Sequence, residues 1–439
     1  MRSLVLAAVL LAAAGAARSE ADTGSAFPLS RFHSPRIAEA VARVTVTCAA
    51  CAWDDQGREG VTLAFTLDNR APVHLPVVRA GSAEYEVMLG SVEAGAHTLR
   101  VEADEDLTAL ELRRADAYTI GALTVDQYVE TDPSYRARSL APILYARPDT
   151  IGRFTDVPVF MWYEIEPAGL GTRYRYSVVF TNEDGGTPTD RLMATWGRTT
   201  DIEYIYSVVV DATGKILADD YQGPDHVTTP FRGKREGRHP LLWVSTENNM
   251  VRDQGEAGVR YAPAVQHFRL RNVSREAVMD ANPWLYDVMS RELMRENKIV
   301  PDAPPGRNVI PDPRRFMYIE ACGEVGTSAL AFGVRAGDGW VASDRGVREY
   351  RIVRDGCFRA AIPLPDSVSA RDVRALRAQA FPRPPRNGEP PPPASPVRLT
   401  RINKIFMLDE AYRPGETRLQ WEGDTTLQPG GPPVEFTLP

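Results

Sequence analysis

The sequence predicts a mainly β protein made of several β-sandwich units in series. Short runs of alternating apolar and polar residues recur along most of the 439 residues, and turn-forming residues separate them. Gly and Pro are both frequent, with 33 and 35 copies, and many of them stand between these runs. One stretch, near residues 274–297, has a convincing helical pattern. Since 439 residues exceed one typical domain, we expect three units.

The first 17 residues have the pattern of a secretory signal peptide. Met1-Arg2-Ser3 gives a positive start, an apolar run over 4–14 follows, and Ala14-Gly15-Ala16-Ala17 gives an A-x-A cleavage site. This run is too short to span a bilayer, and no later stretch approaches the length of a transmembrane helix. We therefore expect a signal peptide over 1–17, a flexible leader over 18–39, and a secreted or periplasmic protein without a transmembrane segment.

The charge balance excludes a general nucleic-acid binder. The chain has 51 Lys and Arg against 58 Asp and Glu, a net charge of −7, and its basic residues are scattered. Only four of the 51 are Lys, and we interpret the Arg excess as background composition. An apolar content of 43% with 25% charged residues also excludes a disordered chain and a multi-span membrane protein.

The four cysteines fit an oxidising compartment. We expect two disulfides, one within the C-A-A-C stretch from Cys48 to Cys51 and one between Cys322 and Cys357. A redox role for C-x-x-C and a four-Cys zinc site stay open as alternatives.

The three units differ in their patterns. Residues 40–125 carry period-2 runs about ten residues apart, which indicates a small β-sandwich. Within it, the stretch 92–99 resembles bacterial immunoglobulin-like modules. Residues 140–312 form a central β unit that ends in the helical segment, which we expect to break at Pro283, with an apolar stripe facing the core. Residues 313–439 form a disulfide-bearing β unit, interrupted by a proline-rich loop over 382–396.

The residues most suggestive of chemistry gather in the central unit. Asp201 and Glu203 stand two apart on an expected strand, so both carboxylates point to one face. Two neighbouring carboxylates repel unless a cation or a shared proton relieves them, which indicates a Ca²⁺ or Mg²⁺ site or an acid/base pair. His226 is the expected third metal ligand, and further ligands could come from Asn182, Glu183, Asp184 and Asp225. The alternative is a solvated strand face beside ordinary turn residues.

This segment resembles the necrosis-inducing (NLP-type) proteins and is similar to the vacuolar protein sorting (number 62) family. Toxin members carry G-H-R-H-D-W-E, and the matching positions are Gly197, Asp201 and Glu203. Arg198 and Thr200 stand in the places of the two His, and Ile202 in the place of the Trp. The resemblance spans residues 145–251. It implies a β-sandwich with a divalent cation held by Asp, Glu and a His, and a sphingolipid head group as ligand.

We therefore expect an exported binding protein that recognises a glycan or lipid head group at a cell surface through a divalent-cation site. A membrane surface stays open as a partner. The rival is a metal-dependent polysaccharide hydrolase or lyase that uses Asp201 and Glu203, with His226 or His239 as the base. The strand also resembles the E-x-D-x-E strand of retaining β-glucanases, with Thr199 in the nucleophile's place. A third alternative is a structural envelope protein without a ligand.

Overall fold

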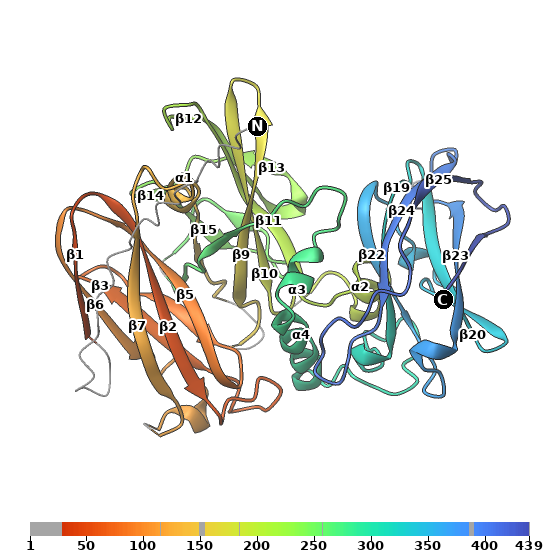
Figure 1. Ribbon diagram of the computed structural model, residues 1–439, viewed down its shortest axis with the longest axis horizontal. Coiled ribbons are helices and arrows are strands. Elements are labelled where there is room, and N and C mark those ends of the chain that lie inside the picture. Colours follow the sequence, from red (N-terminus) through yellow and green to blue (C-terminus); the bar gives the residue numbers. More distant parts are fainter. Residues whose placement is uncertain are drawn as a thin grey trace, which may run out of the picture.

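The computed structural model describes residues 29–438, apart from 115, 149–153, 184, 257 and 386–389. Strands dominate this part of the chain and form several separate sheets, which confirms the expected mainly β, multi-sandwich class (Figure 1). The expected signal peptide over 1–17 lies outside the described residues.

The first unit is a sandwich of two sheets. In one sheet β2 lies between β5 and β7, and in the other the order is β1-β6-β3-β4. From Ala42 onwards alternate side chains of β2 are buried, because one face of each sheet packs against the other, while the first residues of the strand are buried on both faces. The expected leader over 18–39 is wrong in its second half, since residues 29–34 pair with β6 and β2 begins at Ala38. The elements are β1 (Leu29–Ser34), β2 (Ala38–Cys48), β3 (Val61–Leu67), β4 (Val73–Val77), β5 (Gly81–Val92), β6 (Gly95–Ala103), η1 (Leu110–Leu112), β7 (Thr119–Tyr128) and α1 (Tyr135–Ser139).

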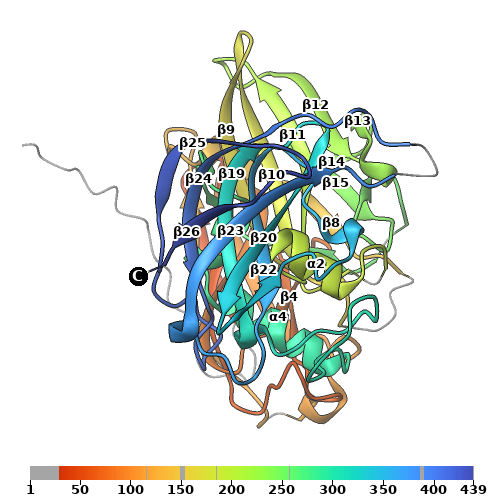
Figure 2. The same ribbon diagram turned by 90° about the vertical axis from the view of Figure 1, so that its right-hand side faces the viewer.

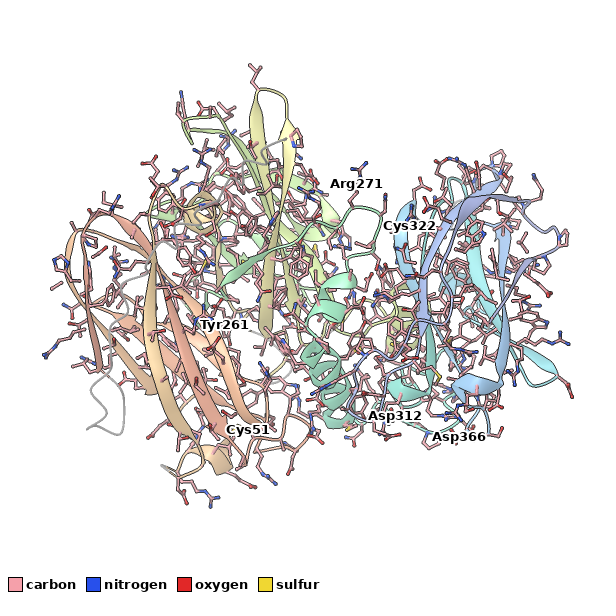
Figure 3. All side chains as sticks on the ribbon, in the orientation of Figure 1. Cys51, Tyr261, Arg271, Asp312, Cys322 and Asp366 are labelled. Carbon is pink, nitrogen blue, oxygen red and sulfur yellow. A yellow bond between two sulfur atoms is a disulfide. The ribbon has the colours of Figure 1, made fainter. Side chains whose placement is uncertain are left out.

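The second sheet of this sandwich continues into the central unit. Strand β4 pairs in parallel with the short β17, which is followed by β8, β15 and β14 in the same sheet. One hydrophobic core accordingly runs from Val44 of the first unit to Tyr176 and Val208 of the central unit. Tyr261 of β17 lies at this junction (Figure 3). The strands are β8 (Ile143–Tyr145), β14 (Arg235–Glu236), β15 (His239–Val244), β16 (Val251–Arg252), which pairs with β15, and β17 (Arg260–Tyr261).

The central unit is built on a second sheet of six strands, in the order β13-β12-β11-β10-β9-β18. Helices α3 and α4 are separated at Pro283, as the sequence predicts, and the stripe through Leu285, Val288 and Leu293 is buried. Helix α2 follows Pro188 and is an element that was not predicted from the sequence. The elements are β9 (Pro158–Ala168), β10 (Gly171–Phe180), α2 (Thr189–Trp196), β11 (Asp201–Val210), β12 (Ile216–Gln222), η2 (Pro224–His226), β13 (Thr228–Pro230), β18 (Val265–His267), α3 (Ala277–Ala281) and α4 (Trp284–Arg295).

The third unit is a sandwich of two four-stranded sheets with its own core. The sheet orders are β22-β19-β24-β25 and β21-β20-β23-β26, and Figure 2 shows the two sheets stacked. Its elements are η3 (Pro313–Arg315), β19 (Phe316–Glu324), β20 (Ser328–Ala336), β21 (Gly339–Ala342), η4 (Arg348–Tyr350), β22 (Gly356–Pro363), η5 (Ala370–Asp372), β23 (Val373–Pro382), β24 (Val397–Phe406), β25 (Trp421–Leu427) and β26 (Val434–Thr437).

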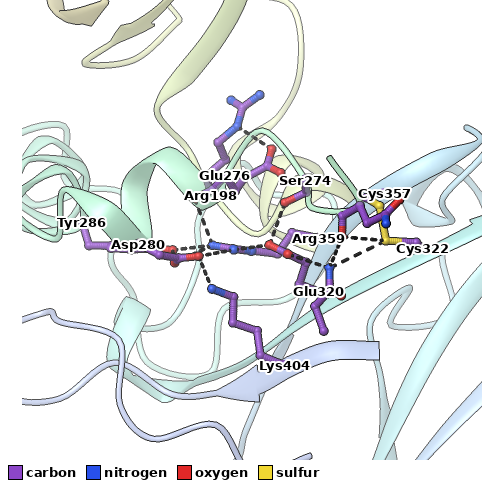
Figure 4. A network of polar contacts seen from close by, with 12 residues as sticks. Arg198, Ser274, Glu276, Asp280, Tyr286, Glu320, Cys322, Cys357, Arg359 and Lys404 are labelled. Carbon is purple, nitrogen blue, oxygen red and sulfur yellow. Dashed lines mark hydrogen bonds and ion pairs between the residues drawn. A yellow bond between two sulfur atoms is a disulfide. The ribbon is translucent and has the colours of Figure 1, made fainter. Parts of the chain in front are cut away.

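A buried polar network fastens the third unit to the helices of the central unit (Figure 4). Arg359 of β22 is fully buried and pairs with Asp280 of α3 and with Glu320 of β19. It also donates to the Tyr286 hydroxyl at 2.5 Å, and Lys404 of β24 pairs with Asp280. Despite burial, which opposes ionisation, the adjacent Arg359 and Lys404 lower the pKa of Asp280 to about 2. Asp280 is therefore ionised and paired, as a buried charge must be.

Candidate functional site

Strands β10 and β11 bring the expected acidic residues together at one end of the central sheet. Asp201 pairs in register with Phe180, and Glu203 pairs with Val178. Because side chains alternate along a strand, Asp201 and Glu203 share a face of the sheet. Asn182 and Glu183 follow the end of β10 and therefore lie next to the start of β11.

The turn before β11 depends on Gly197, which ends helix α2. Its φ of 62° lies in the left-handed region, where Gly is favoured, and its amide donates to Met193 O at 3.0 Å. A Cβ at this position would lie 2.8 Å from Cγ of Arg359. The glycine of the G-x-x-x-D-x-E pattern thus has a structural role, since it allows α2 to approach β22 and sets the start of β11.

Asp201 is only 3% exposed and has polar neighbours on two sides. Asn249 Nδ2 donates to Asp201 Oδ2 and to the Asn182 carbonyl, each at 3.0 Å. Arg198 Nη1 lies 4.0 Å from Asp201 Oδ1, while Arg198 Nε donates to Glu276 at 3.1 Å. Arg198 therefore places a fixed positive charge beside Asp201.

Glu203 is linked to His226 through Gln222. The Gln222 amide nitrogen lies 2.8 Å from Glu203 Oε2 and 2.8 Å from His226 Nδ1. His226 is exposed on the short helix η2. The structure thus brings His226 to the same end of the sheet as Glu203, with one amide group between them.

Glu183 lines a small cavity beside this cluster. The cavity has a volume of about 160 Å³ and lies between the loop after β10 and the end of helix α4, where Glu292 of the helix and Glu296, the residue after it, also line it. Glu183 accepts a hydrogen bond from the Thr187 amide at 2.9 Å. Lys298 lines the cavity too and pairs with Glu296 at 2.7 Å.

The three carboxylates of Glu183, Asp201 and Glu203 influence one another, and we call them the acidic cluster. Burial, and secondly the charge of Asp201, raise the pKa of Glu183 to about 8 and that of Glu203 to about 8. Burial also raises the pKa of Asp201, although Arg198 and the hydrogen bond from Asn249 act in the opposite direction. Without a cation, ionising the whole cluster at neutral pH is therefore unfavourable.

The donor atoms of the acidic cluster are of the chemical type that hard cations prefer. They are all oxygens, and the buried Asn249 Oδ1 adds an amide oxygen for which the described residues provide no hydrogen-bond partner. Such oxygens are the ligands of Ca²⁺ and Mg²⁺, and Mg²⁺ in particular keeps several waters beside one or two carboxylates. Within the described residues, no three His, Cys, Asp or Glu side chains converge closely enough to enclose a metal ion by themselves.

The other expected site residues have separate positions. His239 is buried on β15, where its ring nitrogens contact Glu39 at 2.9 Å and the Ala141 carbonyl at 2.8 Å. Burial opposes its protonation, but the hydrogen bond to Glu39 raises its pKa above the ordinary value. Asp225 is exposed in η2 with a positive φ of 59°. Asp184 lies outside the described residues.

Sequence reasoning missed Gln222 and Asn249, the two amides that contact the acidic cluster. Asn249 has a φ of 57°, a conformation that Asn tolerates better than most residues and that fits its Asn248-Asn249 turn. The Asn-Asn turn was therefore the sequence signal that could have identified Asn249.

Both expected disulfides are present. Cys48 joins Cys51, and Cys322 joins Cys357 between neighbouring strands β19 and β22. All four cysteines form disulfides and none has a free thiol, which excludes the alternative of a four-Cys zinc site. Among the described helices, none is long and apolar enough to cross a membrane.

Comparison with known proteins gives structural matches to parts of the chain. No family model and no curated protein matches. The structure "NLPPya in complex with glucosamine" matches 31% of this chain and 74% of its own, with 11% identity and a TM-score of 0.24. A mannosamine complex of the same protein matches equally. A GH26-CBM35 β-(1,4)-mannanase from Podospora anserina matches 26% of this chain and 21% of its own, with 18% identity and a TM-score of 0.18. The expected resemblance to NLP-type structures is thus confirmed as a match to about a third of the chain.

Proposed function

We propose that this chain is an exported, secreted or periplasmic binding protein that recognises a glycan or lipid head group through a divalent cation, Ca²⁺ or Mg²⁺. Asp201 and Glu203 supply carboxylate ligands, Asn249 supplies an amide oxygen, and Glu183 and His226 lie at the edge of the site. The remaining ligands are water or the oxygens of the head group.

The observation that carries this proposal is that Glu183 and Glu203 lie close enough to Asp201 for its charge to raise the pKa of each, beside the unsatisfied Asn249 Oδ1. Arg198 offsets this repulsion only in part, because the pKa values of all three carboxylates remain raised, so the arrangement costs free energy in the absence of a further positive ligand. A bound cation offsets that cost and offers its open positions to hydroxyl or phosphate oxygens. The two disulfides are compatible with an oxidising, extracytoplasmic compartment.

The size of the neighbouring cavity favours a binder over a polysaccharide hydrolase. This cavity, which Glu183 lines but Asp201 and Glu203 do not, has about 160 Å³ and lies below the roughly 300–1,000 Å³ of typical ligand sites, so the space next to the cluster suits a single head group better than a sugar chain. His239, one of the two expected bases, is occupied by Glu39 and Ala141 in another part of the fold.

Co-sedimentation with vesicles tests this function. The protein is mixed with phosphatidylcholine vesicles that contain or lack a glycosphingolipid, in Ca²⁺ or in EDTA. We expect sedimentation only with the glycolipid and Ca²⁺, and loss of it in Glu203→Gln but not in Glu416→Gln, a change at an exposed site of the third unit. Competition by the free head-group sugar distinguishes glycan from lipid recognition. Equal sedimentation in EDTA would contradict the role of the cation.

A further inference from the structure

A second cavity lies between the first unit and the central unit. It has a volume of about 340 Å³ and is lined by Arg43 of β2, by β4, β5 and the turn between them, by the beginning of β9, and by the segments that lead into β18 and α4. None of its lining residues belongs to the acidic cluster. Its volume falls within the range of sites for small molecules.

Backbone hydrogen bonds fix the two walls of this interdomain cavity relative to each other. The Met88 amide donates to the Ala262 carbonyl at 2.8 Å, and the Ala264 amide donates to the Glu86 carbonyl at 3.3 Å. Val87 and Pro263 form an antiparallel bridge between the same two segments. The cavity is therefore pre-formed and does not depend on a flexible linker.

Arg79 is the residue of this cavity that points to a ligand. Its guanidinium lies 5.8 Å from the ring centroid of Tyr85 and 5.5 Å from that of Trp284, so two aromatic rings hold it in place. Among the described residues, no carboxylate and no other side-chain acceptor lies within bonding distance of this guanidinium. The hydrogen bond from Arg79 to the Tyr85 hydroxyl comes from the backbone amide and leaves the guanidinium donors unused. A guanidinium held in this way has its planar set of donors free for a carboxylate.

Arg43, whose guanidinium also lines the cavity, differs from Arg79 because it has carboxylate partners within the protein. It pairs with Glu84 at 2.7 Å, with Glu86 at 2.6 Å and with Asp126 at 3.3 Å. The carboxylates of the protein are therefore already engaged at the Arg43 end. A ligand carboxylate has Arg79 as its charge partner, and the Glu84 end accepts hydrogen bonds from hydroxyl groups.

We propose that the interdomain cavity binds an acidic sugar, with the carboxylate of a uronic acid residue on Arg79. The half-buried Trp284 and Tyr85 offer ring faces to the C–H groups of a sugar. The Gln266 amide and the amide oxygen of Asn282, whose nitrogen donates to the Val278 carbonyl, are available to its hydroxyls. This site is independent of the proposed cation site and gives the protein a second, differently charged ligand.

Calorimetric titration with a galacturonic acid trimer and with its methyl ester tests the inference. The ester keeps the sugar chain but removes the charge, so it is the matched ligand control. The titrations are performed in EDTA, which abolishes binding at a cation site but leaves binding to Arg79 intact. We expect the wild type to bind the acid, and the ester to bind about tenfold more weakly or worse, because a hydrogen bond to a charged group is lost.

The variants Arg79→Gln and Arg79→Lys separate recognition from folding. Arg79→Gln should weaken binding of the acid about as much as esterification does, and Arg79→Lys should keep only part of the affinity, because Lys lacks the fork geometry. Arg371→Gln, at an exposed residue of the third unit, should bind like the wild type. No binding of the acid by the wild type, equal binding of acid and ester, or unchanged binding in a folded Arg79→Gln variant would each overturn the proposal. The acid–ester comparison uses the wild type alone, so it decides the question even if Arg79→Gln fails to fold.

Discussion

The pH dependence of stability should reveal the acidic cluster most clearly through Glu203→Gln. Burial, and secondly the charge of Asp201, raise the pKa of Glu203 from its ordinary 4.5 to about 8. Between these two values the folded protein keeps a proton that the unfolded chain releases, so stability falls as pH rises. One such carboxyl costs up to about 1.4 kcal/mol per pH unit, or about 3 kcal/mol between roughly pH 5.5 and 7.5.

Glutamine has the size of protonated Glu but cannot ionise. Glu203→Gln should therefore reduce the slope of the free energy of unfolding against pH by up to about 1.4 kcal/mol per pH unit, the contribution of one proton. The assay is urea unfolding in EDTA, followed by Trp fluorescence, at several pH values within that window. Glu416→Gln, at an exposed carboxylate, is the control and should run parallel to the wild type. The reasoning is refuted if Glu203→Gln also runs parallel to the wild type, since Glu203 would then titrate normally in the folded state.

Three further predictions concern the scaffold. Gly197→Ala should lower the melting temperature more than Gly169→Ala, because both have φ near 60° but only a Cβ at 197 meets Arg359; equal shifts would contradict a role for that contact. Arg359→Leu should destabilise the protein by about 3–5 kcal/mol in chemical unfolding, since it leaves buried acids without their partner, and a loss below about 1 kcal/mol would contradict this. Replacing both Cys322 and Cys357 with Ser should cost about 4 kcal/mol, because their disulfide closes a 35-residue separation, and an unchanged unfolding midpoint would contradict it.

Much of the fold is visible in the sequence because strands and turns are local patterns. The alternation in the second half of β2, the apolar ends of β10 and β11 and the break at Pro283 each lie within about a dozen residues. Helix α2 was not predicted because it has only eight residues, and the stability of a short helix depends on packing more than on its own sequence pattern. The continuation of the first sandwich into the central unit was not predicted either, because β17 has two residues and β8 has three, which is too short for a recognisable strand pattern.

The candidate site was predictable only where one strand carries it. Asp201 and Glu203 are two residues apart, so period 2 alone brings them together. Gln222 and Asn249 reach them from other segments of the chain, and contacts of that kind depend on the tertiary fold. Arg198 illustrates the same limit, because its position beside both Asp201 and Glu276 depends on how α2 and the chain before α3 pack.

Calorimetric titration of the calcium-free protein with CaCl₂ and with MgCl₂ tests the central claim most directly. The proposed site predicts saturable binding of at least one of the two cations by the wild type, and about tenfold weaker binding or none in Asp201→Asn, which removes a charged ligand. Glu416→Gln should bind as the wild type does. Failure of the wild type to bind either cation, or equal binding by a folded Asp201→Asn variant, would contradict the proposed cation site.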